Sequence, residues 1–228
     1  IFDEQSLLEL KPHYDRSLIT TFARLDGHVV GVIASNPMFN AGAMGWGACE
    51  KATSFIALCD SFHIPLLFLH DTPGFFVSKA AEENKMPLRI MQFFEALHHA
   101  SVPKIALILR KSYGMAHFNM LGGNMGADSL LAWPGADISF MAPDVAVNVV
   151  YGRKIQAAEN PQEVQAALLQ QMKEANEPWL PAGLNEIHDI IDPADTRSEL
   201  RRALVRSFGA NPEYRKSKRH IASWPTMF

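Results

Sequence analysis

The sequence predicts an α/β protein in which strand–strand–helix units repeat around a mixed sheet. Two apolar runs, 65–69 and 103–109, have the composition of strands that are buried on both faces. Each run leads into a loop and then into a segment whose apolar residues recur at helical spacing. Earlier in the chain, Asp26-Gly27 separates two short strand-like runs and predicts a hairpin. The length of 228 residues suffices for one large domain or two small ones.

The N-terminal part is expected to contain an arm, a hairpin, a loop and a helix. Residues 1–16 have a mixed composition and are interpreted as a linker or arm. The strands of the hairpin are predicted at 18–25 and 28–34, joined by a type I′ turn. Residues 36–47 are too glycine-rich for a regular element, and loops of that length are often functional. A helix is predicted to follow over 47–62.

Two further units follow, each with a buried strand, a loop and a helix. The run 65–69 is expected to end in a loop over 70–76, and a helix over 86–100 leads to the strand at 103–109. Beyond that strand, we expect a corner at Tyr113-Gly114 where another helix begins. Loops and helix N-termini therefore collect on one side of the sheet, where binding sites are normally built.

The C-terminal part is predicted to hold short strands followed by helices. The strands are placed at 130–134 and 138–141, and the helices at 143–151, 162–176 and 196–208. Thr196 and Glu199 have the spacing of a capping box at the start of the last helix, and Gly209 suits its end.

Charge and cysteine content bear on partners and on compartment. The net charge of −3 gives no support for a nucleic-acid partner. No apolar stretch approaches the ~18 residues of a transmembrane helix, so no membrane span is expected. Cys49 and Cys59 lie ten residues apart on one predicted helix, a rise of about 15 Å that is too long for a disulfide. We expect free, buried thiols in a reducing compartment, the cytoplasm or, in a eukaryote, the mitochondrial matrix.

The segment 110–117 is the strongest candidate for a functional site. A buried strand ends here and a helix begins, with Gly114 at the corner. Such a corner leaves backbone N–H groups at a helix N-terminus, where they can hold developing negative charge. The alternative is a simple strand–helix turn in which Gly114 adopts a left-handed conformation.

Five pieces of the sequence, taken in order, resemble one known family. They are the hairpin, Asp71-Thr72-Pro73-Gly74-Phe75, Arg110-Lys111-Ser112-Tyr113-Gly114, Ala132-Trp133-Pro134 with Ile138, and Asp189-Ile190-Ile191-Asp192-Pro193 with Thr196-Arg197. The chain resembles the C-terminal domain of the carboxyltransferase component of biotin-dependent acyl-CoA carboxylases. The propionyl-CoA and methylcrotonyl-CoA carboxylases are the nearest types, and the resemblance covers nearly the whole chain.

The resemblance implies a crotonase-like fold of repeated ββα units. Residues 17–228 would form the C-terminal carboxyltransferase domain, with a helical region from about 162. In the family this domain holds biotin, an N-terminal domain holds most of the acyl-CoA, and the active site lies between domains of two subunits. The implied partners are therefore that N-terminal domain, the biotin carboxyl carrier and biotin carboxylase components, and further copies of the chain. We expect this chain to supply half of the active site.

The resemblance also assigns site residues around the corner. The backbone amides of Met115 and Ala116, placed by Gly114, would hold the ureido oxygen of biotin. Many relatives have glycine at the position of Met115, so the pocket around that side chain is expected to differ. His117 and Phe118 would line the acyl pocket; alternatively, both pack inside the helix.

The loop before the corner is assigned to biotin as well. Thr72, Pro73, Gly74 and Phe75, together with Tyr113, would wall the biotin site. The alternative is a strand-exit turn in which Phe75 caps the core. Likewise, the glycine-rich loop 41–47 contacts either biotin and its lysine arm or only solvent.

Other candidate sites are weaker. The nine histidines are scattered, and no pair has metal-ligand spacing with further ligands nearby. Ser112 has no evident His and acid partners in the sequence, and no Gly-x-Ser-x-Gly motif is present. The segment 122–126 lacks the Lys-Ser/Thr of a P-loop and more simply allows close helix packing. The basic residues at 215–219 are interpreted as a solvated tail, or else they meet a subunit or the phosphates of CoA.

The predicted function is carboxyl transfer from carboxybiotin to the α-carbon of an acyl-CoA, stabilised by backbone oxyanion holes, with no metal on this chain. One alternative is a crotonase-type acyl-CoA hydratase or isomerase. That enzyme needs a glutamate beside the oxyanion hole, and the segment 113–126 contains none. The other alternative is a non-catalytic assembly domain of a carboxylase.

Overall fold

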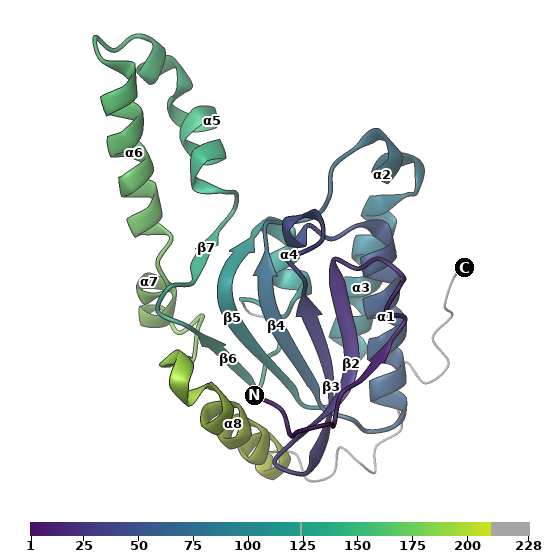
Figure 1. Cartoon of the computed structure of the whole chain (residues 1–228). Coiled ribbons are helices and arrows are strands. Elements are labelled where there is room, and N and C mark those ends of the chain that lie inside the picture. Colours follow the sequence, from purple (N-terminus) through teal and green to yellow (C-terminus); the bar gives the residue numbers. More distant parts are fainter. Residues whose placement is uncertain (124, 211–228) are drawn as a thin grey trace.

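The computed structural model describes residues 1–123 and 125–210. Over these residues eight strands form one sheet in the order β1-β2-β3-β4-β5-β6-β8, and β7 pairs with the end of β5 (Figure 1). The strands are β1 (Leu8–Leu10), β2 (Leu18–Leu25), β3 (His28–Ser35), β4 (Leu66–Thr72), β5 (Lys104–Tyr113), β6 (Ser129–Ala132), β7 (Asp137–Ser139) and β8 (Asp189–Ile190).

Helices cover both faces of the sheet. The α-helices are α1 (Trp46–Ser61), α2 (Lys79–Glu83), α3 (Met86–His99), α4 (Gly114–Asn119), α5 (Pro143–Gln156), α6 (Pro161–Ala175), α7 (Trp179–Gly183) and α8 (Thr196–Ala210), with 3-10 turns η1 (Asn40–Gly42) and η2 (Pro193–Asp195). Helices α1 and α3 pack on one face and α8 on the other, whereas α5 and α6 form a hairpin that projects away from the sheet (Figure 1). No helix within 1–123 and 125–210 is long and apolar enough to cross a bilayer.

The predicted hairpin is confirmed. Strands β2 and β3 are antiparallel, with Leu25 opposite His28 across the turn. Asp26 has φ +54° and Gly27 has φ +80°, and two left-handed central residues define a type I′ turn. The hairpin depends on these two residues, which is why the local sequence sufficed to predict it.

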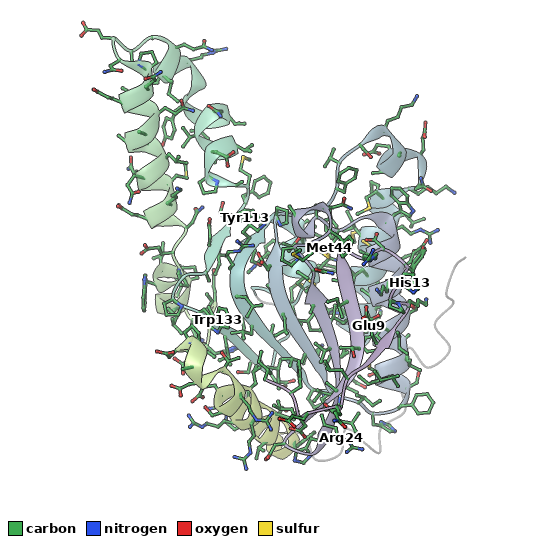
Figure 2. The ribbon with its side chains drawn as sticks, viewed as in Figure 1. Glu9, His13, Arg24, Met44, Tyr113 and Trp133 are labelled. Atoms are coloured by element: carbon green, nitrogen blue, oxygen red, sulfur yellow. The ribbon has the colours of Figure 1, made fainter. Side chains whose placement is uncertain are left out.

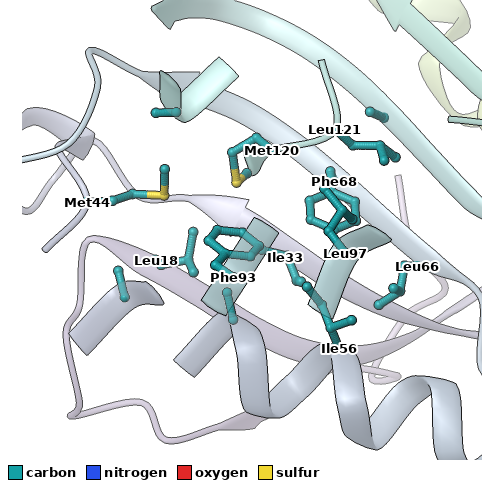
Figure 3. Packing of buried hydrophobic residues seen from close by; sticks show 14 of the residues in the cluster. Leu18, Ile33, Met44, Ile56, Leu66, Phe68, Phe93, Leu97, Met120 and Leu121 are labelled. Carbon is teal, nitrogen blue, oxygen red and sulfur yellow. The ribbon is translucent and has the colours of Figure 1, made fainter. Parts of the chain in front are cut away.

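The buried strands are parallel and alternate their side chains between two cores. Strands β3, β4, β5 and β6 pair in parallel, so their carboxyl ends share one edge. Along β4, Leu66 and Phe68 face the core under α1 and α3, whereas Leu67 and Leu69 face the core under α8 (Figure 3 shows the first core). A period of two with helices on both faces explains why every position of this run is apolar.

Strands β4 and β5 extend beyond their predicted ends. The polar residues of 70–72 remain in β4 because Thr72 pairs with Ser112, after a shift of register that follows His70. On its other side, the end of β5 is paired by β7. The loop expected over 70–76 therefore starts only after Thr72. In the segment 1–16, expected as an arm, β1 pairs with β2.

The start of the last helix differs from the prediction of a capping box. Thr196 is already helical (φ −48°, ψ −48°), and its hydroxyl donates to Pro193 O and accepts from Trp133 Nε1 at 2.9 Å. The side chain of Asp192 accepts from the amide of Ala194 instead and caps η2. Helix α8 also continues through Gly209 to Ala210, so glycine does not end it there. The basic cluster at 215–219 lies outside the described residues.

Cys49 and Cys59 are free and fully buried on α1, as predicted. Burial raises the pKa of both thiols, which stay protonated at neutral pH.

Candidate active site at the carboxyl edge of the sheet

Three loops meet where β3, β4 and β5 end. Met44, in the glycine-rich loop, forms a parallel bridge with Phe75. The amide of Met44 donates to Gly74 O at 3.0 Å, and Lys111 Nζ donates to Ala41 O at 3.1 Å. Figure 2 shows Met44 and Tyr113 at this edge. The glycine-rich loop is thus hydrogen-bonded both to the loop after β4 and to the end of β5, the two segments that the sequence indicates as candidate site residues.

The loop after β4 is held by its own threonine. Thr72 is fully buried, and its hydroxyl donates to Gly42 O at 2.8 Å and accepts from the amide of Gly74 at 3.2 Å. A Cβ at Gly42 would lie 2.5 Å from Asp71 O, so only glycine permits this approach. The hydroxyl of Thr72 therefore shapes the loop, and Pro73, Gly74 and Phe75 are the half-buried residues that can face a ligand.

Two features of the corner require glycine at position 114. Gly114 has φ +58°, and a Cβ there would lie 3.0 Å from Phe140 O. It begins α4, whose first-turn amides have no acceptor within the helix. Ala116 is fully buried, whereas the side chain of Met115 is 40% exposed. Met115 therefore fits at this position by turning its side chain to the surface while keeping its amide in the corner.

The phenol of Tyr113 is bonded to another part of the protein. Its side chain is buried, and the hydroxyl donates to Asp137 Oδ2. Asp137 Oδ1 in turn accepts from Asn176 Nδ2 at 2.9 Å. Burial and the bond to Asp137 raise the pKa of Tyr113. The phenol thus ties β5 to β7 and to the end of α6.

An ion pair joins the ends of β4 and β5. Arg110 makes two hydrogen bonds to Asp71, Nε to Oδ1 at 3.2 Å and Nη2 to Oδ2 at 2.9 Å. This side-chain hydrogen bonding is the main cause that raises the pKa of Arg110. The two-point contact fixes the strand ends from which both loops leave.

A cavity of about 400 Å³ opens beside the corner. Its described lining residues are Gly114, His117, Phe118, Gly123, Met125, Ile138, Ser139, Phe140 and Glu186. The structure thus brings His117 and Phe118 together with Gly114 of the corner in the wall of one cavity. Thr72, Pro73, Gly74 and Phe75 are not among these lining residues and lie with Met44 instead.

Two groups at the site escaped the sequence reasoning. Glu186 reaches the cavity from the segment between α7 and β8. Ser112 has no evident His partner in the sequence, but its Oγ lies 3.0 Å from His70 Nδ1 and 2.9 Å from His117 Nδ1. Its position opposite the end of β4 depends on the register shift after His70, which no local sequence pattern indicates.

Both histidines are uncharged at neutral pH. Burial lowers the pKa of His70 to about 3, and the neighbouring His117 contributes to the same shift. Burial lowers the pKa of His117 to about 4. Among the described residues, no group of three His, Cys, Asp or Glu side chains is arranged to hold a metal ion.

A mixed sheet with helices on both faces and a glycine corner that leads into a helix is the arrangement of a crotonase-like protein. Comparison of the sequence with protein families finds the carboxyl transferase domain over residues 1–221. The chain belongs to this family, as the resemblance indicated.

Known relatives agree with this assignment. The methylmalonyl-CoA carboxyltransferase 12S subunit of Propionibacterium freudenreichii subsp. shermanii is 36% identical over 221 residues, 96% of this chain and 42% of that protein. The biotin-dependent long chain acyl-coenzyme A carboxylase beta4 subunit of Mycobacterium tuberculosis is 36% identical over 90% of this chain and 40% of its own length.

A solved structure confirms the crotonase-like fold. The crystal structure of the transcarboxylase 12S hexamer with methylmalonyl-CoA superposes with a TM-score of 0.87 at 36% identity, covering 92% of this chain and 40% of that one. The chain therefore spans less than half the length of these relatives.

Proposed function

We propose that this chain is the biotin-side domain of an acyl-CoA carboxyltransferase, which moves a carboxyl group from carboxybiotin to the α-carbon of an acyl-CoA. The observation that carries the proposal is the family match over residues 1–221 combined with the geometry of the Gly114 corner. The relatives support it, since two of them are described as an acyl-CoA carboxyltransferase and a biotin-dependent acyl-CoA carboxylase subunit.

The corner fits an anionic oxygen. Two consecutive amides, those of Met115 and Ala116, lie in the first turn of α4 and are not used within the helix. Gly74 leaves room beside the residue that precedes the corner, because a Cβ there would be 4.0 Å from its nearest neighbour, Tyr113 O. When bound, carboxybiotin would supply the carboxyl group, and the two amides would hold its ureido oxygen, where negative charge develops. Preorganised donors of this kind contribute roughly 10²–10³ in rate each.

The remaining residues of the site have separate tasks. Pro73, Gly74 and Phe75 wall the biotin side, and the backbone of Thr72 and Tyr113 sets the two strand ends. His117 and Phe118 line the cavity that receives the acyl group, which is mostly apolar. Phe118 is 41% exposed and narrows this cavity from one side.

A complete enzyme needs partners beyond this chain. Because the chain spans 42% of the 12S relative, we propose that an N-terminal carboxyltransferase domain supplies the CoA side. A biotin carboxyl carrier and a biotin carboxylase would deliver the carboxyl group. We also propose a homo-oligomer, since the 12S relative is described as a hexamer, and a cytoplasmic or mitochondrial-matrix location.

Glu186 gives one observation in favour of a second function. A crotonase-type hydratase or isomerase needs a carboxylate beside its oxyanion hole, and Glu186 lines the cavity at the corner. It is exposed on this chain, so its carboxylate is accessible to a ligand in the cavity. We rank this function second because the family match concerns carboxyl transfer.

One assay separates the two functions. The full assembly is supplied with bicarbonate, ATP and a panel of acyl-CoAs, and separately with enoyl-CoAs. Carboxyl transfer requires acyl-CoA-dependent incorporation of labelled bicarbonate that avidin abolishes. The second function would be established instead if the assembly hydrates enoyl-CoA without any carboxylation and Glu186→Gln abolishes that hydration.

A further inference from the structure

The hydroxyl of Ser112 bridges two imidazoles below the cavity. Ser112 is fully buried at the end of β5, between His70 of β4 and His117 of α4. Both contacts use Nδ1, at 3.0 Å from His70 and 2.9 Å from His117. His117 lines the cavity, whereas His70 is fully buried. A chain of hydrogen bonds thus runs from the interior to the wall of the candidate acyl pocket.

A single hydroxyl proton determines how the two rings can be protonated. If Ser112 donates to one Nδ1, its oxygen accepts an N–H from the other Nδ1. One neutral imidazole must then carry its proton on Nδ1 and the other on Nε2. Two imidazolium rings would both point N–H groups at the same oxygen and leave the hydroxyl proton without an acceptor.

The ring of His117 is also held in place by packing. A Cβ at Gly122 would lie only 2.3 Å from His117 Cε1, so the ring rests directly on that glycine. The ring of Phe118 meets it edge-on at a centroid distance of 5.3 Å. With Ser112 on Nδ1, the imidazole has a defined orientation at the cavity wall. The other polar side chains among the described lining residues of this cavity are those of Ser139 and Glu186.

We propose that His117 is the uncharged hydrogen-bonding group that positions the acyl ligand in this cavity. Ser112 and His70 are positioning residues: they hold the ring of His117 and couple its protonation to that of His70, so that the two rings carry their protons on different nitrogens. The identity of the ligand rests on the proposed carboxyltransferase function, whereas the opposite protonation of the two rings does not.

The protonation pattern is tested directly by neutron diffraction from crystals of the deuterium-exchanged protein at pH 7.5. The expected result is one deuteron on Ser112 Oγ, directed at one Nδ1, and one deuteron on the other Nδ1. Deuterons on both Nδ1 atoms, or on neither, would overturn the proposal. This measurement needs no activity, so it is independent of whether the proposed function holds.

Kinetics of the full assembly test the positioning role. Ser112→Ala should raise the KM for acyl-CoA about 10-fold, the equivalent of about 1.4 kcal/mol, while the KM for the biotinylated carrier stays unchanged. The same change in a His117→Ala background should have no further effect, because Ser112 acts through that ring. The matched control is Ser129→Ala, a buried serine at the opposite end of the sheet.

Two kinetic results would count against the positioning role. Equal losses from Ser112→Ala in the presence and absence of His117 would mean that Ser112 acts independently of the ring. An equal rise of both KM values would mean a general structural defect. Should carboxylation fail with every acyl-CoA while neutron diffraction shows the expected deuterons, the proposed function fails and the protonation pattern stands.

Discussion

The two buried histidines predict a specific loss of stability in mild acid. In the unfolded chain both rings titrate at their ordinary pKa of 6.5, whereas in the folded protein the values are about 3 for His70 and about 4 for His117. Between the folded and unfolded pKa values the unfolded state binds more protons. The contribution of the two neutral rings to the free energy of unfolding is therefore complete above pH 6.5 and falls as the pH is lowered below that value. At pH 5.0, which is 1.5 units below the unfolded pKa, each ring lowers the free energy of unfolding by about 2 kcal/mol, and the pair lowers it by about 4 kcal/mol.

Urea unfolding of the purified protein at pH 7.5 and pH 5.0, at one protein concentration, measures this loss. In His117→Asn the difference in free energy of unfolding between the two pH values should shrink by about 2 kcal/mol. His98→Asn, at an exposed position on α3, is the matched control and should keep the full difference. Because both folded-state values lie below pH 5.0, the expected loss hardly depends on their exact size. The reasoning is refuted if His117→Asn shows the same pH dependence as the parent protein.

Further substitutions test the packing around the site. Gly122→Ala places a Cβ 2.3 Å from His117 Cε1 and should raise the KM for acyl-CoA in steady-state assays. The control Gly152→Ala, whose Cβ would have nothing within 4 Å, should leave that KM unchanged and stabilise α5 by up to about 1 kcal/mol. Equal KM values for the two variants would count against the position of the His117 ring. Trp133→Phe removes the indole N–H that donates to Thr196 at 2.9 Å and should lower the free energy of urea unfolding by about 1 kcal/mol, and no change would show that this bond does not anchor α8.

Local signals predicted the parts of the fold that depend on local chemistry. The type I′ turn follows from Asp26-Gly27, and both residues have positive φ. The strand runs follow from continuous apolar sequence, because helices on both faces bury every side chain. The ends of β4 and β5 were missed because the polar residues that extend them are paired by neighbouring strands, which no local pattern reveals.

The candidate site divides in the same way. The Gly114 corner was predicted from a strand, a glycine and a helix adjacent in sequence. The partners of Ser112 were not, since His70 is 42 residues away and comes close only through the register shift in β4. Glu186 was missed for a related reason, because the segment after α7 returns to the cavity from a distant part of the chain.

The central claim is that backbone amides of α4 stabilise the negative charge that develops on the ureido oxygen of biotin during carboxyl transfer. The direct measurement compares Met115→Pro, which removes one amide, with Met115→Ala, which keeps the amide and shortens the exposed side chain. The second residue of α4 lies in the first turn, where proline is best tolerated. In a carboxyl-transfer assay of the intact assembly, we expect Met115→Pro to lose roughly 10²–10³ in kcat while Met115→Ala stays near the parent rate. Equal rates for the two variants, with the oligomer preserved, would contradict the claim.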